Sequence, residues 1–296
     1  MARLRSECIG CLLRHHINAA PEEAPEEMKR EYLQKLLGIL ADASKDISTP
    51  LLIEEIVQMR KDYFPLNNEY AEIKKYFNNL MMEYEAEVGE KIKSSDDPLK
   101  AALQFSMVGN FIDFGAMDSI DENKLHELLM TYNEVAVDQE ELRKLKAQLE
   151  KAKRLVLLAD NCGEIVMDKL LLRELRREYP EISLCCMVRG EPVINDATME
   201  DAIQVGITDE FKVVGNGSGI CGTVPERLSP EAKEIFDNAD IILSKGQGNF
   251  EALHHCGKNV YYAFLCKCRM FAEMFGVEQF SGILASEEKV QREIFL

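Results

Sequence analysis

The feature that most constrains the fold is a change of pattern near residue 154. From there on, short apolar runs alternate with segments of helical period. The runs cover residues 154–160, 182–189, 211–215, 240–246 and 259–265, and the helical segments cover 164–179, 198–206, 230–239 and 249–256. Continuous apolar strands that alternate with helices are typical of a parallel sheet covered on both faces. We therefore predict an α/β fold with a mostly parallel sheet for the second half of the chain.

The first half of the chain shows helical periodicity only. Apolar residues three and four apart recur in residues 26–44, 51–64, 69–92 and 99–114, and a charged helix is predicted for 138–153. Breaks are predicted at Thr49-Pro50, at Pro65-Leu66 and at residues 96–98. This division predicts a helical region over residues 1–150 and an α/β metal-binding catalytic region over residues 151–296.

Composition limits the partners. The net charge of −17 repels polyanions, so we expect neither a nucleic acid nor an anionic membrane as a partner. An acidic protein can still bind a small phosphorylated molecule when a metal ion and a few cations are concentrated in one pocket. The sequence has nine cysteines, an odd number, with no membrane-spanning apolar run and no signal-peptide pattern. We expect a cytoplasmic protein with reduced thiols, and the pattern specifies no oligomeric state.

Polar and charged residues follow the ends of the predicted strands. Ligands bind beyond the carboxyl ends of the strands in sheets of this kind. The residues in question are Asp160, Asn161 and Glu164 after the first strand, Arg189 and Asp196 after the second, Lys245, Gly246, Asn249 and Glu251 after the fourth, and Lys267 after the fifth. Oxygen ligands, cations and glycine turns are therefore expected along one edge of the sheet.

Three of these residues form a candidate metal site. Carboxylate and carboxamide oxygens are the ligands that hard divalent cations prefer, and such ions keep waters that a substrate can displace. Asp160, Asn161 and Asp196 fit this chemistry. The alternative is that both aspartates only cap the helices that follow them.

A candidate phosphate site lies after the fourth strand. Lys245 and the amide groups of residues 246–249, at a predicted helix N-terminus, suit a phosphate group, and Arg189 can add a second cation. The segment 217–222 formally matches a dinucleotide-binding glycine pattern. However, two prolines follow it and it succeeds the third strand of the region, so a loop that closes over a ligand is the preferred interpretation.

The thiols at the N-terminus allow several interpretations. On a helix, Cys8, Cys11 and His15 share one face. They can form half of a zinc site completed by Cys266, Cys268 or His16, or a redox pair, or they can be idle thiols.

Two other classes of function stay open at this point. One is a methyl- or nucleotidyl-transferring enzyme that uses the glycine loop, and the other is a non-catalytic metal or redox sensor.

Several segments together resemble one family. Residues 157–168 (LLADNCGEIVMD), 188–198 (VRGEPVINDAT), 244–253 (SKGQGNFEAL) and 266–268 (CKC) are similar to the signature segments of the metal-dependent damage-control phosphatases, formerly domain of unknown function family 89. The N-terminal CIGC resembles the prokaryotic, CxxC-bearing subgroup. The segment 109–115 (GNFIDFG) resembles a further family element, so the likeness extends over nearly the whole chain.

The resemblance implies a function and a set of roles. It implies a helical N-terminal part joined to a three-layer α/β/α sandwich, and a divalent ion (manganese, nickel, cobalt or magnesium) held by an Asp-Asn pair and a later Asp. The matching residues here are Asp160, Asn161 and Asp196. It also implies hydrolysis of small phosphate esters, such as sugar phosphates and damaged phosphometabolites.

The resemblance leaves some roles open. Asn110 and Asp113 are either substrate-facing or a polar pair at a helix end. Glu164 or Asp160 is the expected base, with a covalent phosphoryl intermediate on Asp160 as the alternative. The hypothesis at this stage is a metal-dependent phosphatase for small phosphorylated metabolites.

Overall fold

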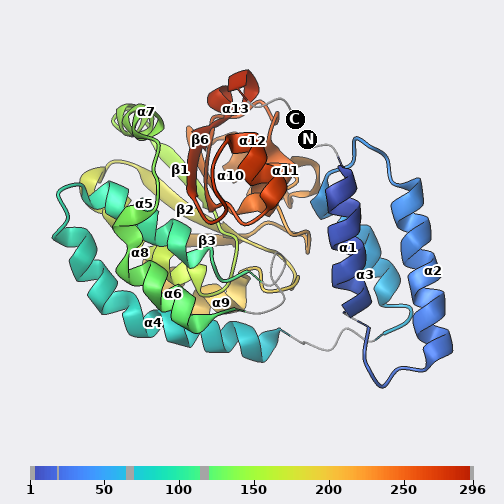
Figure 1. Cartoon of the computed structure of the whole chain (residues 1–296). Helices are drawn as coiled ribbons and strands as arrows, with labels where there is room; N and C mark the ends of the chain where they lie inside the picture. Colours follow the sequence, from blue (N-terminus) through green and yellow to red (C-terminus); the bar gives the residue numbers. More distant parts are fainter. Residues whose placement is uncertain (1–3, 19, 65–69, 114–119, 294–296) are drawn as a thin grey trace.

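The computed structural model describes residues 4–18, 20–64, 70–113 and 120–293 (Figure 1). Its centre is a six-stranded sheet in the order β3-β2-β1-β4-β5-β6. The strands are β1 (Arg154–Leu158), β2 (Ser183–Val188), β3 (Lys212–Gly215), β4 (Ile241–Lys245), β5 (Val260–Leu265) and β6 (Gly282–Ser286). The first five strands run parallel and β6 pairs antiparallel with β5. The five predicted strands are confirmed, and β6 was not predicted.

Helices cover both faces of this sheet. One layer contains α4 (Ala71–Lys93), α5 (Pro98–Gly109), α6 (Glu122–Met130), α7 (Gln139–Leu149), α8 (Glu164–Glu178) and α9 (Met199–Gln204). The other contains α10 (Pro230–Asp237), α11 (Gln247–Leu253), α12 (Arg269–Phe275) and α13 (Glu287–Glu293). The fold is therefore the predicted three-layer α/β/α sandwich.

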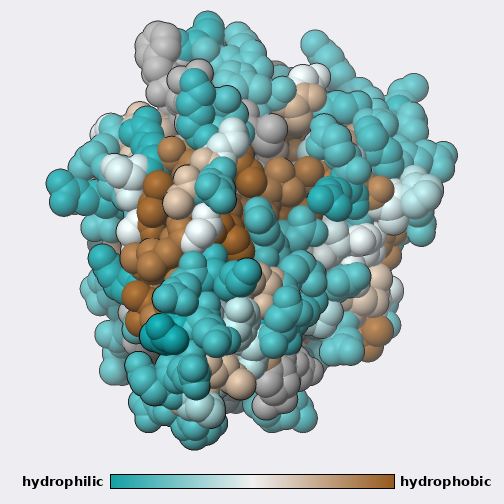
Figure 2. All heavy atoms as spheres, turned by 90° about the vertical axis from the view of Figure 1, so that its right-hand side faces the viewer, coloured by the Kyte–Doolittle hydropathy of each residue, from teal (hydrophilic) through white to brown (hydrophobic). Residues whose placement is uncertain are grey.

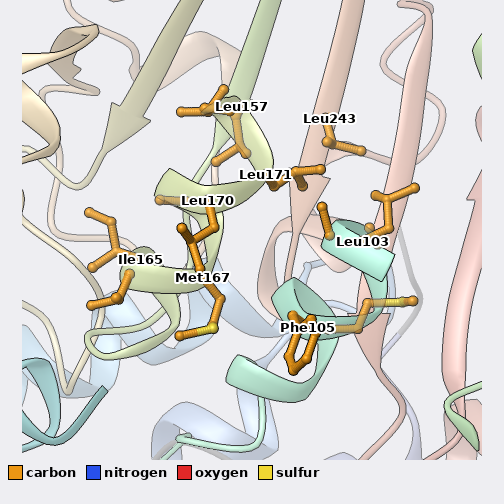
Figure 3. Packing of buried hydrophobic residues seen from close by; sticks show 14 of the residues in the cluster. Leu103, Phe105, Leu157, Ile165, Met167, Leu170, Leu171 and Leu243 are labelled. Carbon is orange, nitrogen blue, oxygen red and sulfur yellow. The ribbon is translucent and has the colours of Figure 1, made fainter. Parts of the chain in front are cut away.

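The strands separate the two apolar cores because side chains alternate between the faces of a sheet. Leu155 and Leu157 of β1 belong to the core on the α5 and α8 side, whereas Val156 and Leu158 belong to the core on the α10–α13 side. Figure 3 shows the first core, with Leu157 packed near side chains of α5 and α8. This two-sided burial explains why the strands are continuous apolar runs.

The N-terminal helices form a smaller unit of their own. Helices α1 (Ser6–Asn18), α2 (Glu26–Asp42) and α3 (Thr49–Arg60) share a separate apolar core, and α3 packs on α11. By contrast, α4 to α7 pack in the same core as the sheet. The division of apolar cores therefore lies between α3 and α4, whereas the predicted division at residue 150 follows secondary structure. The predicted break at Pro65-Leu66 lies outside the described residues.

The unit of α1 to α3 leaves apolar surface uncovered. Figure 2 shows this side of the molecule, where brown apolar atoms lie among hydrophilic ones. Four large apolar side chains on α1 and α2 are exposed, namely Ile9, Ile17, Met28 and Leu37. Among the described residues, no helix is long and apolar enough to cross a membrane.

The strand order fixes where a ligand site can form. The chain goes from β1 outward to β2 and β3, and then returns to β4 on the other side of β1. Connections that leave two adjacent parallel strands in opposite directions open a crevice beyond the carboxyl ends of those strands. The segments after β1 and β4 lie at this switch point. The sequence predicted a site along the carboxyl edge of the sheet, but not the order of the strands.

Candidate active site

Asp160, Asn161 and Asp196 lie together, although they follow different strands. Asn161 and Asp196 form an isolated antiparallel bridge, and the Ala197 amide donates to the Asp160 carbonyl at 2.7 Å. The loop after β2 is held by these backbone contacts and includes Ile194, whose φ of 43° is a strained conformation. The predicted proximity of the three residues is therefore present in the structure.

Glycines allow the backbone to approach this group closely. Gly246, the residue after β4, has a φ of 78°, and an added Cβ would lie 2.0 Å from Asp160 Oδ2. Gly163 precedes α8 with a φ of 68°, and an added Cβ would lie 2.7 Å from Ile112 Cδ1. Both turns thus require glycine for conformation and for space.

The amide of Asn161 has a fixed orientation. Its Nδ2 donates to Asp160 Oδ2 at 2.7 Å and to Glu164 Oε2 at 3.1 Å. Because the nitrogen takes these acceptors, Asn161 Oδ1 faces away from them and is available as a ligand. Asp196 is similar: Arg189 Nε donates to its Oδ2 at 2.6 Å, and its Oδ1 has no donor among the described residues.

The charge of the site suits a divalent cation. Five carboxylates face three cations, which leaves an excess of two negative charges. The carboxylates are Asp113, Asp160, Glu164, Asp168 and Asp196, and the cations are Arg189, Lys245 and Lys267. Burial, and then the charges of Glu164 and Asp196, raise the pKa of Asp160 well above its usual value. Burial raises the pKa of Asp196 to about 6 in spite of Arg189. A bound cation would relieve this repulsion.

The candidate ligand set includes a carboxamide in addition to carboxylates. No group of three or more His, Cys, Asp or Glu side chains that could hold a metal occurs in the described parts of the chain. The set proposed here has two carboxylates and one carboxamide, which is the all-oxygen chemistry of Mg²⁺ and Mn²⁺ sites that keep several waters. The residues present therefore fit the group that the sequence predicted.

Arg189 is almost fully buried between the two aspartates. Its Nη2 lies 3.4 Å from Asp160 Oδ1, and its Nη1 donates to Asn249 Oδ1 at 3.2 Å and to Thr223 Oγ1 at 3.4 Å. Thr223 follows the glycine segment 217–222, so Arg189 links that loop to the site. Asn249 in turn donates to the carbonyls of Ala159 and Lys245, at 3.2 and 2.7 Å.

Lys245 does not face an open phosphate cradle. Its ammonium donates to Glu164 Oε1 at 2.5 Å and to the Ser106 carbonyl at 3.1 Å, and it lies 3.2 Å from Asp168 Oδ1. Three acceptors occupy its three N–H groups, and its side chain is completely buried. The contacts differ from the predicted phosphate role and indicate that Lys245 holds Glu164 in place.

Glu164 is hydrogen-bonded at both carboxylate oxygens. Besides Lys245, it accepts from Asn110 Nδ2 at 2.8 Å and from the Asn161 backbone amide at 3.2 Å. These donors occupy both oxygens of the carboxylate. Glu164 therefore orients the two asparagines, whereas the sequence left it open as a candidate base.

The remaining predicted residues divide into two groups. Asn110 and Lys267 belong to the site, because Asn110 Nδ2 also donates to Asp160 Oδ2 at 3.0 Å and Lys267 binds both the Asn110 carbonyl and Asp113. Glu251 does not belong to it. It is half-buried on α11 and accepts a hydrogen bond from Thr49 of α3, which places it at the junction with α1 to α3.

The role of Cys8, Cys11 and Cys268 as a second metal site stays a prediction. All nine cysteines are free thiols. Cys8 contacts Met270, with its Sγ 3.8 Å from Sδ, Cys11 is exposed, and Cys268 is half-buried at the start of α12. The described residues contain no ligand group for zinc at this position. The redox interpretation of Cys8, Cys11 and Cys268 stays a prediction.

Sequence reasoning missed two residues that support the site. Asp168 and Ser106 contact Lys245, and the Ser106 hydroxyl donates to Asp168 Oδ1 at 2.6 Å. The available signal was the spacing of Glu164 and Asp168, four apart on a helix with only apolar residues between them.

Comparisons with known proteins show the family of this chain. A family model described as the damage-control phosphatase ARMT1-like domain matches residues 4–283. An uncharacterized protein of Methanocaldococcus jannaschii is 30% identical over 293 residues, which covers 95% of each chain. A damage-control phosphatase of Archaeoglobus fulgidus is 30% identical over 277 residues, covering 91% of this chain and 94% of the relative.

The fold has a counterpart among solved structures. The crystal structure of a DUF89 family protein from Pyrococcus horikoshii superposes with a TM-score of 0.77 at 23% identity, and covers 97% of this chain and 100% of that one. This likeness shows the fold, and the family model matches nearly the whole chain. The chain therefore belongs to the damage-control phosphatase family with an ARMT1-like domain.

Proposed function

We propose that this protein hydrolyses small phosphorylated metabolites with a divalent metal ion held by Asp160, Asn161 and Asp196. The observation that carries the proposal is the buried oxygen set beyond the carboxyl ends of β1 and β2, with its excess of negative charge. When bound, the ion supplies charge stabilisation and lowers the pKa of a coordinated water. The expected ions are manganese, nickel, cobalt or magnesium.

The protein's own groups then have distinct tasks. Arg189 places a guanidinium between Asp160 and Asp196, where it neutralises charge that develops on a phosphoryl group. Glu164 fixes the amide of Asn161 and keeps its oxygen directed to the ion. The burial of the whole group excludes bulk water and strengthens these interactions.

Asp160 is the carboxylate that we assign as the base. Its Oδ2 accepts from Asn110 and Asn161, whereas its Oδ1 has only the long contact with Arg189. Since Glu164 is saturated by donors, Asp160 is the better candidate for the base. The alternative, attack of Oδ1 on phosphorus to give an aspartyl phosphate, predicts a covalently labelled protein after rapid acid quench.

The substrate class follows from the family and the charge. The candidates are small phosphate esters, including sugar phosphates and damaged phosphometabolites, in the cytoplasm. Nothing in the comparisons favours a transferase or a non-catalytic sensor, and the glycine segment 217–222 is followed by a short 3₁₀ turn, Pro225–Arg227, instead of a cofactor-binding helix.

A phosphate-release screen tests the proposal. Chelator-treated protein is supplied with each of the four ions and a panel of sugar phosphates, and released phosphate is measured. We expect turnover only with added metal, and loss of turnover in Asp196→Ala. Equal turnover without metal, or no turnover with any ion and substrate, would contradict the proposal.

A further inference from the structure

A buried cluster around Lys245 is joined to the candidate metal site through Glu164, and its members Ser106 and Asp168 have no role in the proposed mechanism. The Lys245 cluster consists of Ser106, Glu164, Asp168 and Lys245, none of which is exposed to solvent. Its single ammonium lies 2.5 Å from a Glu164 oxygen and 3.2 Å from an Asp168 oxygen. One cation thus serves two carboxylates that lie one turn apart on α8.

Asp168 is more than a counter-ion for Lys245. Glu164 alone would neutralise Lys245, so Asp168 gives the cluster a formal charge of −1 in a site without solvent. The Asp168 Oδ2 atom is also buried and has no hydrogen-bond partner among the described residues. An uncompensated buried carboxylate lowers the stability of a folded chain. Since this charge lowers stability within the cluster, an effect outside the cluster would explain its presence.

The contacts connect this charge to the metal ligands. Lys245 interacts with two carboxylates at once, so its positive charge neutralises Glu164 less completely than it would in a simple ion pair. Glu164 Oε2 accepts from Asn161 Nδ2 at 3.1 Å. A stronger acceptor at this nitrogen polarises the amide and makes Asn161 Oδ1 a better ligand for a cation. The line of contacts therefore runs from Asp168 through Lys245 and Glu164 to Asn161.

We propose that Asp168 is a positioning residue that raises the affinity of the site for a divalent cation without contacting it. This inference rests on the proposed metal site. The charge balance points the same way: replacement of Asp168 by a neutral residue would reduce the excess of negative charge around the site from two to one. Burial raises the pKa of Asp168 to about 6, so the carboxylate is charged at neutral pH.

The test compares metal binding in variants that remove the charge and in one that keeps it. Asp168→Asn keeps the size of the side chain, and Asp168→Ala provides a second neutral variant. Ser106→Ala is the matched control, because it removes the hydroxyl bonded to Asp168 at 2.6 Å but keeps every charge. The dissociation constant for Mn²⁺ and the thermal midpoint of the metal-free protein are measured for each.

We expect both neutral variants to bind Mn²⁺ about tenfold more weakly, the range found for outer-shell partners of metal ligands. Ser106→Ala should bind like the wild type. The midpoint of metal-free Asp168→Asn should not fall, because a buried uncompensated charge has been removed. Wild-type affinity in both neutral variants, or an equal loss in Ser106→Ala, would overturn the inference. Failure of the wild-type protein to bind any divalent ion would instead contradict the proposed function.

Discussion

The backbone at Gly246 lies so close to the carboxylate of Asp160 that a larger residue does not fit. We expect Gly246→Ala to lower the free energy of unfolding by about 2 kcal/mol or more, because the φ is positive and the added Cβ would overlap Asp160. It should also abolish metal binding, since Asp160 must move. Denaturant titration and metal content give the two readouts.

Gly257→Ala is the matched control for this substitution. Gly257 has a similar φ of 73°, but an added Cβ there meets nothing within 4 Å. We expect a loss of only about 1 kcal/mol, from backbone strain alone, with normal metal content. Equal losses of stability and of metal content at both positions would show that overlap with Asp160 does not cause the effect of Gly246→Ala.

Lys245 provides a second prediction for a single residue. Lys245→Met would leave Glu164 and Asp168 buried without a cation, so the free energy of unfolding should fall by about 3–5 kcal/mol. The control is Lys212→Met, which breaks an exposed pair with Glu231 and should change stability by less than about 0.5 kcal/mol. A mild effect of Lys245→Met with reduced affinity for substrate would favour the phosphate role expected from the sequence.

Single residues also show where sequence reasoning succeeds. The proximity of Asp160, Asn161 and Asp196 could be predicted because parallel strands bring their carboxyl ends to one edge of the sheet. The direction of a side chain is not contained in this rule. Lys245 ends β4 at the expected edge, yet its ammonium turns to α8. Asp168 was missed because a charged residue within a helix is normally solvated, and only tertiary packing buries it.

At the scale of elements, apolar runs predicted the parallel strands, because strands buried on both faces have no polar positions. The edge strand β6 was missed because its five residues include glycine and serine and it pairs on one side only. The boundary between α3 and α4 was also missed, since amphipathic helices look alike whether they pack on a sheet or on one another.

The first helix carries a prediction of its own. Cys8 of α1 contacts Met270 of α12, whereas Cys11 is exposed. We expect Cys8→Ser/Cys11→Ser to keep the metal content of the wild type and to lose about 1 kcal/mol of stability, from the poorer packing of Cys8. Release of a tightly held zinc ion by the double substitution would restore the zinc half-site hypothesis.

For the whole molecule, buried carboxylates link stability to pH and to metal. The pKa of Asp168 and of Asp196 is raised to about 6 by burial, above the value near 4 of an unfolded chain. Their contribution to stability is therefore complete below about pH 4 and is lost as the pH rises through about 6. The metal-free protein carries this penalty at neutral pH.

A divalent ion should remove much of the penalty. We expect Mn²⁺ to raise the thermal midpoint more at about pH 7.5 than at about pH 5.5, because at the lower pH protons compete for the same carboxylates. Comparing the shift caused by metal at each pH cancels the effect of groups far from the site. A shift of equal size at both pH values would show that Asp196 does not bind the ion.

The most direct test of the account is the metal content of the purified protein. Wild type, Asp160→Ala and Asp196→Ala are loaded with Mn²⁺, freed of excess ion and analysed for metal per chain, with circular dichroism as the measure of folding. We predict about one ion per wild-type chain and none in either folded variant, because both aspartates belong to one site. Full metal content in either variant would contradict the central claim that Asp160, Asn161 and Asp196 hold a single ion.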